Sequence, residues 1–351
     1  MSFKDTTTAK LEAFAAKTVP KLPAKVIAKV IAKVAGTPLV VDGRTLDPYI
    51  QLAANQSAGG PAMSTLTPQV GRAAAHDGFA ATNGTRAAGV AVRDRNIPGP
   101  DGDLGVRLYH PSDAAGLVPG VLFMHQGGWV IGDLDSCDTF CTRLAAELGA
   151  VVVSLDYRLA PEHRLPAQHQ DADAAWAWMI ANTEGLGIDP SDLVICGDSA
   201  GGQMAATLCQ RLRDAGQPQP AVQAMIYPLT DATATDGSIV SCADSFPLSI
   251  NTMEWFFAQA LPDGFDRSDP ALSPALHDRL SDLAPAVIVT AGFDPLRDQG
   301  NAYAAALRDA GVHVIDRCED SMSHSFLAFG GLSPAAHGAI GRVISDINSL
   351  L

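Results

Sequence analysis

Short runs of consecutive apolar residues alternate with segments of helical periodicity along most of the chain. The apolar runs lie at 120–124, 150–155, 193–196, 222–227, 286–290 and 312–315, and helical patterns separate most of them at 138–148, 170–182, 203–215, 299–310 and 333–350. Strand-like stretches at 90–93 and 105–109 flank a turn and predict an antiparallel hairpin at a sheet edge. Unbroken apolar strands separated by helices are typical of a sheet buried on both faces. The pattern therefore predicts an α/β fold with a mostly parallel central sheet.

The alternation is interrupted once, at about residues 231–281. No strand pattern occurs there, but residues 250–261 have helical periodicity and include Trp255, Phe256 and Phe257. Insertions of this kind lie above the carboxyl edge of a parallel sheet, where loops carry binding sites. We expect the insertion to form part of a lid over a site at that edge.

The first 60 residues carry a different pattern, in which lysine recurs at every fourth position. The lysines are Lys17, Lys21, Lys25, Lys29 and Lys33, and the apolar residues after Pro23 are Val26, Ile27, Val30, Ile31 and Val34. This spacing predicts an amphipathic helix that ends at Gly36, with a basic stripe opposite an apolar face. The preferred interpretation is a cap helix packed on the core with its lysines in solvent. The alternative is an interfacial helix attracted to anionic lipid.

Residues 56–87 are rich in small side chains and contain few large apolar ones. We predict a loosely ordered connection there, with one short helix. The chain is therefore divided into an N-terminal helical cap segment and linker at 1–88 and an α/β domain at 89–351, with the insertion contributing to the cap.

Composition restricts the classes of function. The 351 residues are 47% hydrophobic and carry a formal net charge of −14, which repels phosphate backbones and excludes nucleic-acid binding. The six cysteines have no paired metal-binding spacing and are predicted to be buried, reduced thiols. No apolar run has the length of a membrane span, and the N-terminus lacks the pattern of a secretory signal. We expect a cytoplasmic protein, either a monomer or a homodimer joined at a sheet edge.

A glycine-rich turn directly follows the apolar run at 193–196. It reads Gly197-Asp198-Ser199-Ala200-Gly201-Gly202, and helix-forming residues come immediately after it. Glycines two before and two after a serine allow a sharp turn from strand to helix that lifts the hydroxyl out of the sheet. The same turn directs the backbone N–H of Ala200 to the point where an attacked carbonyl becomes negative. Ser199 is the predicted nucleophile, and Asp198 is predicted to fix the loop.

A second glycine pair follows the run at 120–124. The sequence there is His125-Gln126-Gly127-Gly128-Trp129. Tandem glycines let backbone N–H groups approach a ligand without obstruction by a Cβ atom, as a tetrahedral oxyanion requires. Gly127 and Gly128 are therefore predicted to complete an oxyanion hole with Ala200.

An acid and a base occupy the ends of the last two predicted strands. Asp294 follows the run at 286–290, and His324 comes 30 residues later. The carboxyl ends of parallel strands share one edge, so both should lie near Ser199, in the order Ser, Asp, His. His324 is the predicted base, and Asp294 the residue that fixes its tautomer. Asp298 and His337 are weaker rivals for these two roles, and His163 and His313 are assigned to surface or packing positions.

Four sequence blocks together resemble the hormone-sensitive-lipase-like esterases of the α/β-hydrolase family. They are the H-Q-G-G-W loop, D-Y-R-L-A-P-E-H-R-L-P-A at 156–167, G-D-S-A-G-G around Ser199 and D-P-L-R-D-Q-G at 294–300. The resemblance covers the chain from about Gly89 to its end. It implies an α/β-hydrolase fold with the three residues above as its triad, oxyanion donors at Gly127, Gly128 and Ala200, no metal or cofactor, and a cap built from the N-terminal segment and the insertion after Thr230.

The second block and one departure from the family pattern carry further expectations. Arg158 and Glu162 are suited to pin neighbouring loops by charge-assisted hydrogen bonds, so their predicted role is structural. The family loop is usually His-Gly-Gly-Gly, whereas Gln126 occupies the first glycine position here. If that position requires a positive φ, glutamine costs on the order of 1 kcal/mol and shifts the loop.

The combined motifs predict a serine carboxylesterase that acts on short- to medium-chain acyl esters, small molecules, through an acyl-enzyme. The same triad would also serve an amidase, a lactonase, an acyltransferase or a lipase acting at a lipid surface, and the fold could carry a non-catalytic ligand receptor. Trp129, Trp255 and Phe326 are the aromatic candidates for substrate binding, with core packing as the alternative for each.

Overall fold

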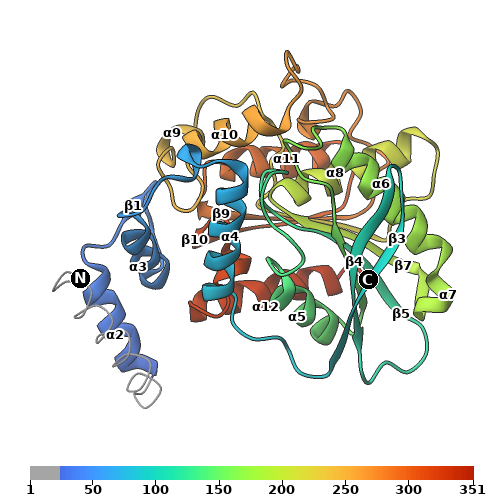
Figure 1. The fold of residues 1–351 in the computed structure, drawn as a ribbon, viewed down its shortest axis with the longest axis horizontal. Helices are drawn as coiled ribbons and strands as arrows, with labels where there is room; N and C mark the ends of the chain where they lie inside the picture. The colour runs from blue at the N-terminus through green and yellow to red at the C-terminus, as the bar shows by residue number, and fades with distance from the viewer. Residues whose placement is uncertain (1–23) are drawn as a thin grey trace.

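The computed structural model describes residues 24–351 and consists of a central sheet flanked by helices (Figure 1). Within these residues, eight strands form one sheet in the order β10-β9-β8-β7-β5-β6-β4-β3. The strands are β3 (Val90–Gly99), β4 (Gly102–Pro111), β5 (Val118–Met124), β6 (Val151–Asp156), β7 (Ile188–Asp198), β8 (Val222–Ile226), β9 (Ala286–Phe293) and β10 (Val314–Ser323). The predicted α/β architecture is confirmed.

The strand directions bring the carboxyl ends of several strands to one edge of the sheet. Strands β5, β6, β7, β8, β9 and β10 run parallel to one another. β4 pairs antiparallel with β6 and with β3, which is the hairpin expected at the sheet edge. The carboxyl ends of β5, β7, β9 and β10 therefore share the edge that carries the predicted site residues.

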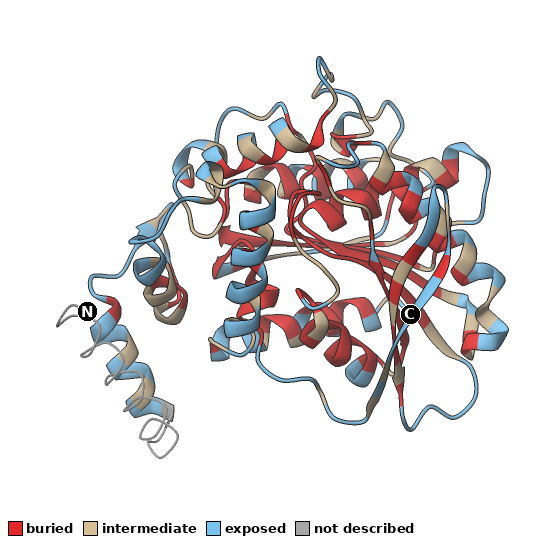
Figure 2. Cartoon of the chain, viewed as in Figure 1, coloured by how far each residue is buried: buried red, intermediate tan, exposed pale blue. Residues whose placement is uncertain are grey.

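Alternating side chains of each strand enter two apolar layers, one on each face of the sheet. In β5, Val121 and Phe123 pack into one layer and Leu122 and Met124 into the other. Helices α5 (Asp138–Leu148) and α12 (Pro334–Asn348) cover the first layer, and helices α6 (Ala167–Ala181), α8 (Ala200–Asp214) and α11 (Arg297–Asp309) cover the second. Figure 2 shows the central strands as buried between them, whereas much of the edge strand β3 is exposed. Successive side chains point to opposite faces, and both faces of the central strands are covered by helices. These strands are therefore unbroken apolar runs with no polar face.

The N-terminal segment forms helices outside these layers. They are α2 (Ala24–Ala35), α3 (Pro48–Ser57) and α4 (Pro68–Thr82), with a small hairpin of β1 (Val40–Val41) and β2 (Arg44–Thr45) between the first two. Helix α2 packs against α3 at the periphery of the molecule (Figure 1). Lys17 and Lys21 of the predicted stripe lie outside the described residues.

The prediction for 56–87 included one helix but underestimated its length, because the four-turn helix α4 takes up 15 residues of this segment. The side-chain oxygen of Thr67 caps the helix by accepting from the N–H of Val70, and Pro68 occupies the first turn. Both are standard start signals, but the small side chains that follow give little helical periodicity. The segment is helical because tertiary contacts, such as that of Gly71 with Trp255, stabilise the helix. A Cβ atom on Gly71 would lie 3.4 Å from the ring of Trp255.

The insertion after β8 also folds as helices. They are α9 (Ser238–Ser241) and α10 (Ile250–Ala260), and α10 carries the aromatic residues singled out in the sequence. The N–H of Leu165 bonds the carbonyl of Ala260 at 2.9 Å, which ties the end of α10 to the domain. Helix α10 also contacts the single turn Met63–Thr65 just before α4, and its Trp255 lies beside Gly71 of α4. Among residues 24–351, no helix has both the length and the apolar character that crossing a membrane requires.

Candidate active site

The turn between β7 and α8 presents Ser199 at the edge of the sheet. Ser199 has φ 53° and ψ −116°, a conformation that side chains rarely adopt, and its N–H bonds the carbonyl of Ile226 at 2.8 Å. The glycines on either side allow the close approach, since a Cβ on Gly197 would lie 2.2 Å from the carbonyl oxygen of Gly201. A strained backbone held in this way fixes the direction of the hydroxyl.

Three side chains from separate elements form a continuous hydrogen-bonded chain. His324, directly after β10, places Nε2 2.8 Å from Ser199 Oγ and Nδ1 2.7 Å from Asp294 Oδ2. Asp294 follows β9, and its other oxygen accepts from the N–H of Leu296 at 2.8 Å. Ser199, His324 and Asp294 are 8%, 4% and 0% exposed. This geometry suits proton transfer from the serine to the imidazole, with the carboxylate fixing the imidazole orientation.

The rival acids and bases lie elsewhere. Asp298 accepts from the N–H of Ser238 and pairs with Arg297, away from His324. His337 lies in α12, where its carbonyl accepts from Arg143. His163 is exposed in the loop before α6, and His313 precedes β10. The structure therefore brings together only the predicted three among the candidates named from the sequence.

A buried acid lies behind the nucleophile. The carboxylate of Asp198 accepts from the hydroxyl of Tyr227 at 2.8 Å, and burial raises the pKa of Asp198 to about 7. The ring of Tyr227 packs against the ring of His324, with centroids 4.8 Å apart. Asp198 thus supports the elbow from below, and Tyr227 joins it to the base. Sequence reasoning missed Tyr227, because its position after a strand gives no sign of which ring it will meet.

The glycine loop after β5 runs beside the elbow. Gly127 and Gly128 have φ values of 126° and 56°. A Cβ on Gly127 would lie 2.0 Å from the carbonyl oxygen of Ile131, and one on Gly128 would lie 2.2 Å from the ring of Phe256. Both positions combine a positive φ with no room for a Cβ atom, and only glycine is compatible with both. Gly128 and Ala200 both line the cavity above Ser199, as oxyanion donors must.

The expected strain at Gln126 is absent. The non-glycine residues with positive φ in the described chain do not include Gln126. Gln126 is 2% exposed, and its side-chain oxygen Oε1 accepts a hydrogen bond from Ser325 Oγ. The condition under which glutamine would be strained, a positive φ, is therefore not met, and the side chain of Gln126 is buried.

An apolar cavity opens over Ser199. Its volume is about 30 Å³, and its walls are Gly128, Trp129, Ser199, Ala200, Leu229, Leu248, Met253, Phe256, Phe257 and Leu296. Trp129 is thus in the wall. Trp255 is not in the wall: it is half-buried beside Gly71 of α4, and its ring packs against that of Phe256 with centroids 5.3 Å apart. Phe326 is fully buried and packs edge-on against Tyr227, so the structure places it in the core.

Charged side chains fasten the cap and the loops around the site. Arg158 bonds Asp171 and Asp101, and Glu162 bonds Arg72 of α4 at 2.5 Å. Arg72 also donates to the carbonyls of Val130 at 2.8 Å and Ala160 at 2.7 Å. Arg158 and Glu162 therefore pin neighbouring segments. The part played by Arg72 had no signal in the sequence, because its partners are 58 to 90 residues away.

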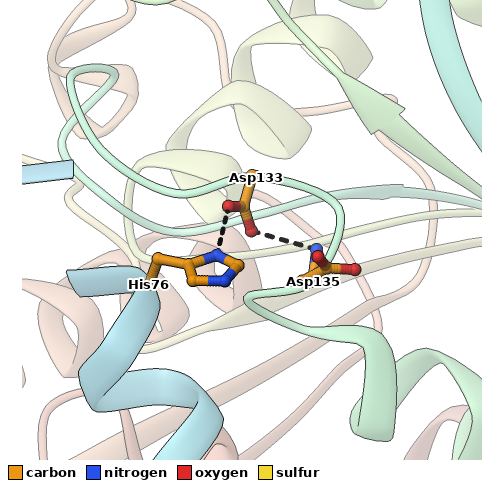
Figure 3. A group of neighbouring side chains, drawn as sticks. All are labelled: His76, Asp133 and Asp135. Carbon is orange, nitrogen blue, oxygen red and sulfur yellow. Dashed lines mark hydrogen bonds and ion pairs between the residues drawn. The ribbon is translucent and has the colours of Figure 1, made fainter. Parts of the chain in front are cut away.

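One surface cluster has the side chains of a metal site. His76, Asp133 and Asp135 lie close together where α4 meets the loop before α5 (Figure 3). Asp133 accepts from His76 Nδ1 at 2.9 Å and from the N–H groups of Asp135 and Ser136, while Asp135 pairs with Arg107 at 2.5 Å. These contacts already occupy the carboxylates, so the cluster fits an ion-paired contact between cap and core better than a cation site.

Comparison with known proteins gives one consistent result. The sequence profile of the alpha/beta hydrolase fold family matches residues 121–328. The carboxylic ester hydrolase LipN of Mycobacterium tuberculosis is 39% identical over 325 residues, which are 90% of this chain and 86% of that protein. The ethyl acetate hydrolase of Pseudomonas putida is 39% identical over 266 residues, 74% of this chain and 83% of that protein.

Solved structures agree with the sequence relatives. An ester hydrolase from the metagenome of Lake Arreo, determined with a bipyridine phosphonate derivative, superposes with a TM-score of 0.80 at 36% identity and covers 87% of this chain and 98% of its own. An esterase of Pyrobaculum calidifontis superposes with a TM-score of 0.80 at 33% identity, covering 87% and 99%.

Proposed function

The chain belongs to the hormone-sensitive-lipase-like group of the α/β-hydrolase family and is a carboxylic ester hydrolase, and from this premise we propose that Ser199, His324 and Asp294 are its catalytic triad. The observation that carries the assignment is the unbroken chain from Asp294 Oδ2 through the imidazole to Ser199 Oγ, with contacts of 2.7 Å and 2.8 Å. All three groups are buried beneath the cavity, where electrostatic interactions are strong because water is excluded.

Acylation follows from this arrangement. Ser199 Oγ attacks the ester carbonyl carbon while His324 Nε2 takes the hydroxyl proton, and the Nδ1–H bond to Asp294 stabilises the resulting imidazolium. The carbonyl oxygen becomes an oxyanion, for which we assign the N–H groups of Gly127, Gly128 and Ala200 as donors. The tetrahedral intermediate collapses, the C–O bond to the alcohol breaks, and the alcohol leaves with the proton from His324.

Deacylation repeats these steps with water. His324 takes a proton from the water as its oxygen attacks the acyl carbon of the ester on Ser199. Collapse of the second intermediate breaks the bond to Ser199 Oγ, which recovers its proton from His324. The products are a carboxylic acid and an alcohol, and the chain needs no other reactant than water.

The cavity supports small acyl groups as substrates. The cavity has a volume of about 30 Å³, and Leu248, Met253 and Phe256 of the insertion form part of its wall. Apolar walls desolvate a short alkyl chain, and a long chain would have to displace α10. We therefore assign short- to medium-chain esters, with the short end preferred.

Hydrolysis of p-nitrophenyl esters of increasing acyl length tests the proposal. Turnover is expected to peak at short acyl chains, and Ser199→Ala is expected to lower kcat by about 10⁶-fold, because the triad acts as a unit. A variant that keeps a tenth of wild-type kcat would remove Ser199 from the mechanism. A peak at long chains, with Ser199 still essential, would contradict only the assignment of acyl length.

We also propose that α2 contacts an anionic lipid surface. Its stripe of Val26, Val30 and Val34 is 42%, 49% and 62% exposed, and the helix has three described lysines beside this stripe and no acidic residue. Apolar side chains flanked by lysines suit burial at a negatively charged interface, where the long lysine chains reach the headgroups. The helix is set apart from the sheet that holds the site (Figure 1).

Vesicle sedimentation separates this proposal from its rivals. The protein is expected to pellet with vesicles that contain anionic lipid and not with neutral ones. Val30→Asp should abolish binding, whereas Val240→Asp, at a valine 65% exposed elsewhere, should not. Absence of binding would overturn the proposal, and so would a dimer in solution that Val30→Asp dissociates, since a second copy would then cover the stripe.

A cytoplasmic location is proposed on the state of the cysteines. All six are free, and five of them are buried. Free thiols persist in reducing compartments. Fractionation of the native host, with the protein detected by antibody, tests the location, and recovery outside the cytoplasm would contradict it.

A further inference from the structure

Gln126 bonds the segment that carries the catalytic base. Its side-chain carbonyl accepts from the hydroxyl of Ser325, 199 residues further along the chain and directly after His324. Both side chains are buried, at 2% and 6% exposed. A single buried hydrogen bond therefore joins the first residue of the glycine loop to the residue beside the base.

Ser325 needs such a partner because of its backbone. It has φ 62° and ψ 24°, the left-handed conformation that is unfavourable for residues with a Cβ atom. Its carbonyl accepts from the N–H of Ala328 at 2.9 Å and begins the short helix that follows. Ser325 directly follows His324, so the peptide bond between them couples the left-handed backbone of Ser325 to the residue that carries the imidazole.

Gln126 is itself held firmly enough to act as an anchor. The backbone carbonyl of Gln126 accepts from His125 Nδ1 at 2.7 Å. Burial lowers the pKa of His125 to about 4, so that the imidazole stays neutral and keeps one proton to donate. The carbonyl of His125 in turn accepts from the hydroxyl of Tyr157 at 2.8 Å, and the two rings stack. The anchor is therefore part of the rigid end of β5.

Stability alone does not account for this side chain. The amide nitrogen Nε2 of Gln126 is buried and has no hydrogen-bond partner within residues 24–351. An unpaired buried donor is unfavourable for folding, which an apolar side chain of similar shape would avoid. A glycine at this position, the usual residue of the family loop, could not reach Ser325.

We propose that Gln126 is a positioning residue for the base: through Ser325 it holds His324 in register with the glycine loop. This rests on the proposed function, in which His324 is the base and Gly127 and Gly128 stabilise the oxyanion. Base and oxyanion donors belong to loops from opposite parts of the chain, and the reaction needs both at fixed distances from one acyl carbon. The bond between Gln126 and Ser325 joins those two loops directly.

A double-mutant cycle in kcat tests the proposal. Gln126→Met keeps the length of the side chain and removes the acceptor, and it is expected to lower kcat by about 10- to 100-fold with KM nearly unchanged, because small displacements of a base are costly. Ser325→Gly adopts positive φ without strain, so the base loop no longer depends on the bond. In that background Gln126→Met should lower kcat by less than about 3-fold.

Three outcomes would overturn the positioning role. They are wild-type kcat in Gln126→Met, an equal loss of kcat from Gln126→Met in both backgrounds, and a loss confined to KM. Ser325→Ala removes the same bond from its other end and should lower kcat to a similar extent, which keeps the test open if Gln126→Met folds poorly. The matched control is Gln223→Met, at a buried glutamine that bonds the carbonyl of Ala284 at 2.8 Å at the opposite end of β8. It should lower Tm and leave kcat unchanged.

Failure of this inference is distinguishable from failure of the proposed function. If Ser199→Ala retains activity, the assigned mechanism is wrong, whatever the Gln126 variants do. A Ser199-dependent enzyme with additive effects at Gln126 and Ser325 would overturn the positioning role alone. The downfield proton resonance of the bond between His324 Nδ1 and Asp294 gives a readout without substrate. It should broaden in Gln126→Met and stay sharp in Gln223→Met.

Discussion

The site edge of the sheet and the N-terminal cap segment are held in place by different means. Ser199, Asp294 and His324 are buried, and the backbone around them is fixed by glycines and by positive φ angles. Residues 24–88 are mostly exposed (Figure 2). Five charged pairs connect them to the domain: Asp42 with Arg297, Arg44 with Asp320, Arg72 with Glu162, His76 with Asp133 and Arg86 with Asp138.

The difference indicates which part of the molecule can change without loss of chemistry. Close-packed backbone at the edge has no room to relax, so a single added atom moves a reacting group. Surface ion pairs are individually weak and separate without disturbing the core. Substitutions at the edge should therefore act on kcat, and substitutions in the cap should act on KM and on local stability.

The largest effect is expected at Asp294, the residue proposed to orient the base. Asp294→Asn keeps the shape of the side chain but favours the wrong imidazole tautomer, and kcat should fall by about 10⁴-fold. Steady-state kinetics on a short p-nitrophenyl ester measure this. Asp298→Asn is the control, because Asp298 bonds Ser238 and Arg297 and should leave kcat unchanged. A fall of similar size in the control would contradict the assignment.

The next effect comes from the contact between the glycine loop and the lid. In Gly128→Ala the new methyl group would lie 2.2 Å from the ring of Phe256, at a φ of 56°. The loop must shift, and we expect kcat to fall on the order of 10²-fold, as when an oxyanion donor is lost. The double variant with Phe256→Ala gives the methyl group room and should recover part of kcat. No loss in Gly128→Ala would show that the lid does not constrain the loop.

A smaller effect should follow from loosening the cap. Arg72→Met removes the bonds to Glu162 and to the carbonyls of Val130 and Ala160, at a cost on the order of 2 kcal/mol in unfolding free energy. KM should rise several-fold while kcat stays within about 3-fold. Arg86→Met, whose arginine is half exposed, should change both constants less. A loss confined to kcat would show that the cap takes part in the chemistry.

The smallest effect is a pH dependence of the cap. Asp133 raises the pKa of His76 above its usual value of 6.5. Because the folded-state pKa is the higher one, the ion pair contributes fully below pH 6.5 and is lost as the pH rises through the raised pKa. Protection of the α4 amides against exchange, relative to their intrinsic exchange rate at each pH, should therefore fall on the alkaline side, and His76→Gln should abolish this fall. An equal pH dependence in the variant would assign it to another group.

Much of the fold and of the site could be predicted from local sequence. The turn around Ser199 needs only neighbouring residues, since glycines at fixed offsets determine where a strand can turn sharply into a helix. The same holds for the glycine pair after β5 and for the alternation of apolar runs with helices. These features depend on steric limits that act within a few residues of the chain.

Features that join distant residues could not be predicted. The sequence left open whether Gln126 needs a positive φ, and the structure has it unstrained and bonded to Ser325. The sequence also suggested a short helix before residue 88, whereas the structure has a four-turn helix docked through Arg72. It also offered Phe326 as a substrate contact, and the structure places this ring in the core against Tyr227.

The turn at the proposed nucleophile, the glycine loop, the order of the proposed acid and base and the parallel sheet were thus determined by the sequence alone, because each follows from conformations that neighbouring residues allow or forbid. Only the tertiary structure decided which side chains meet between loops. A contact such as that of Gln126 with Ser325 depends on how 199 intervening residues pack, and no local property of either residue carries that information.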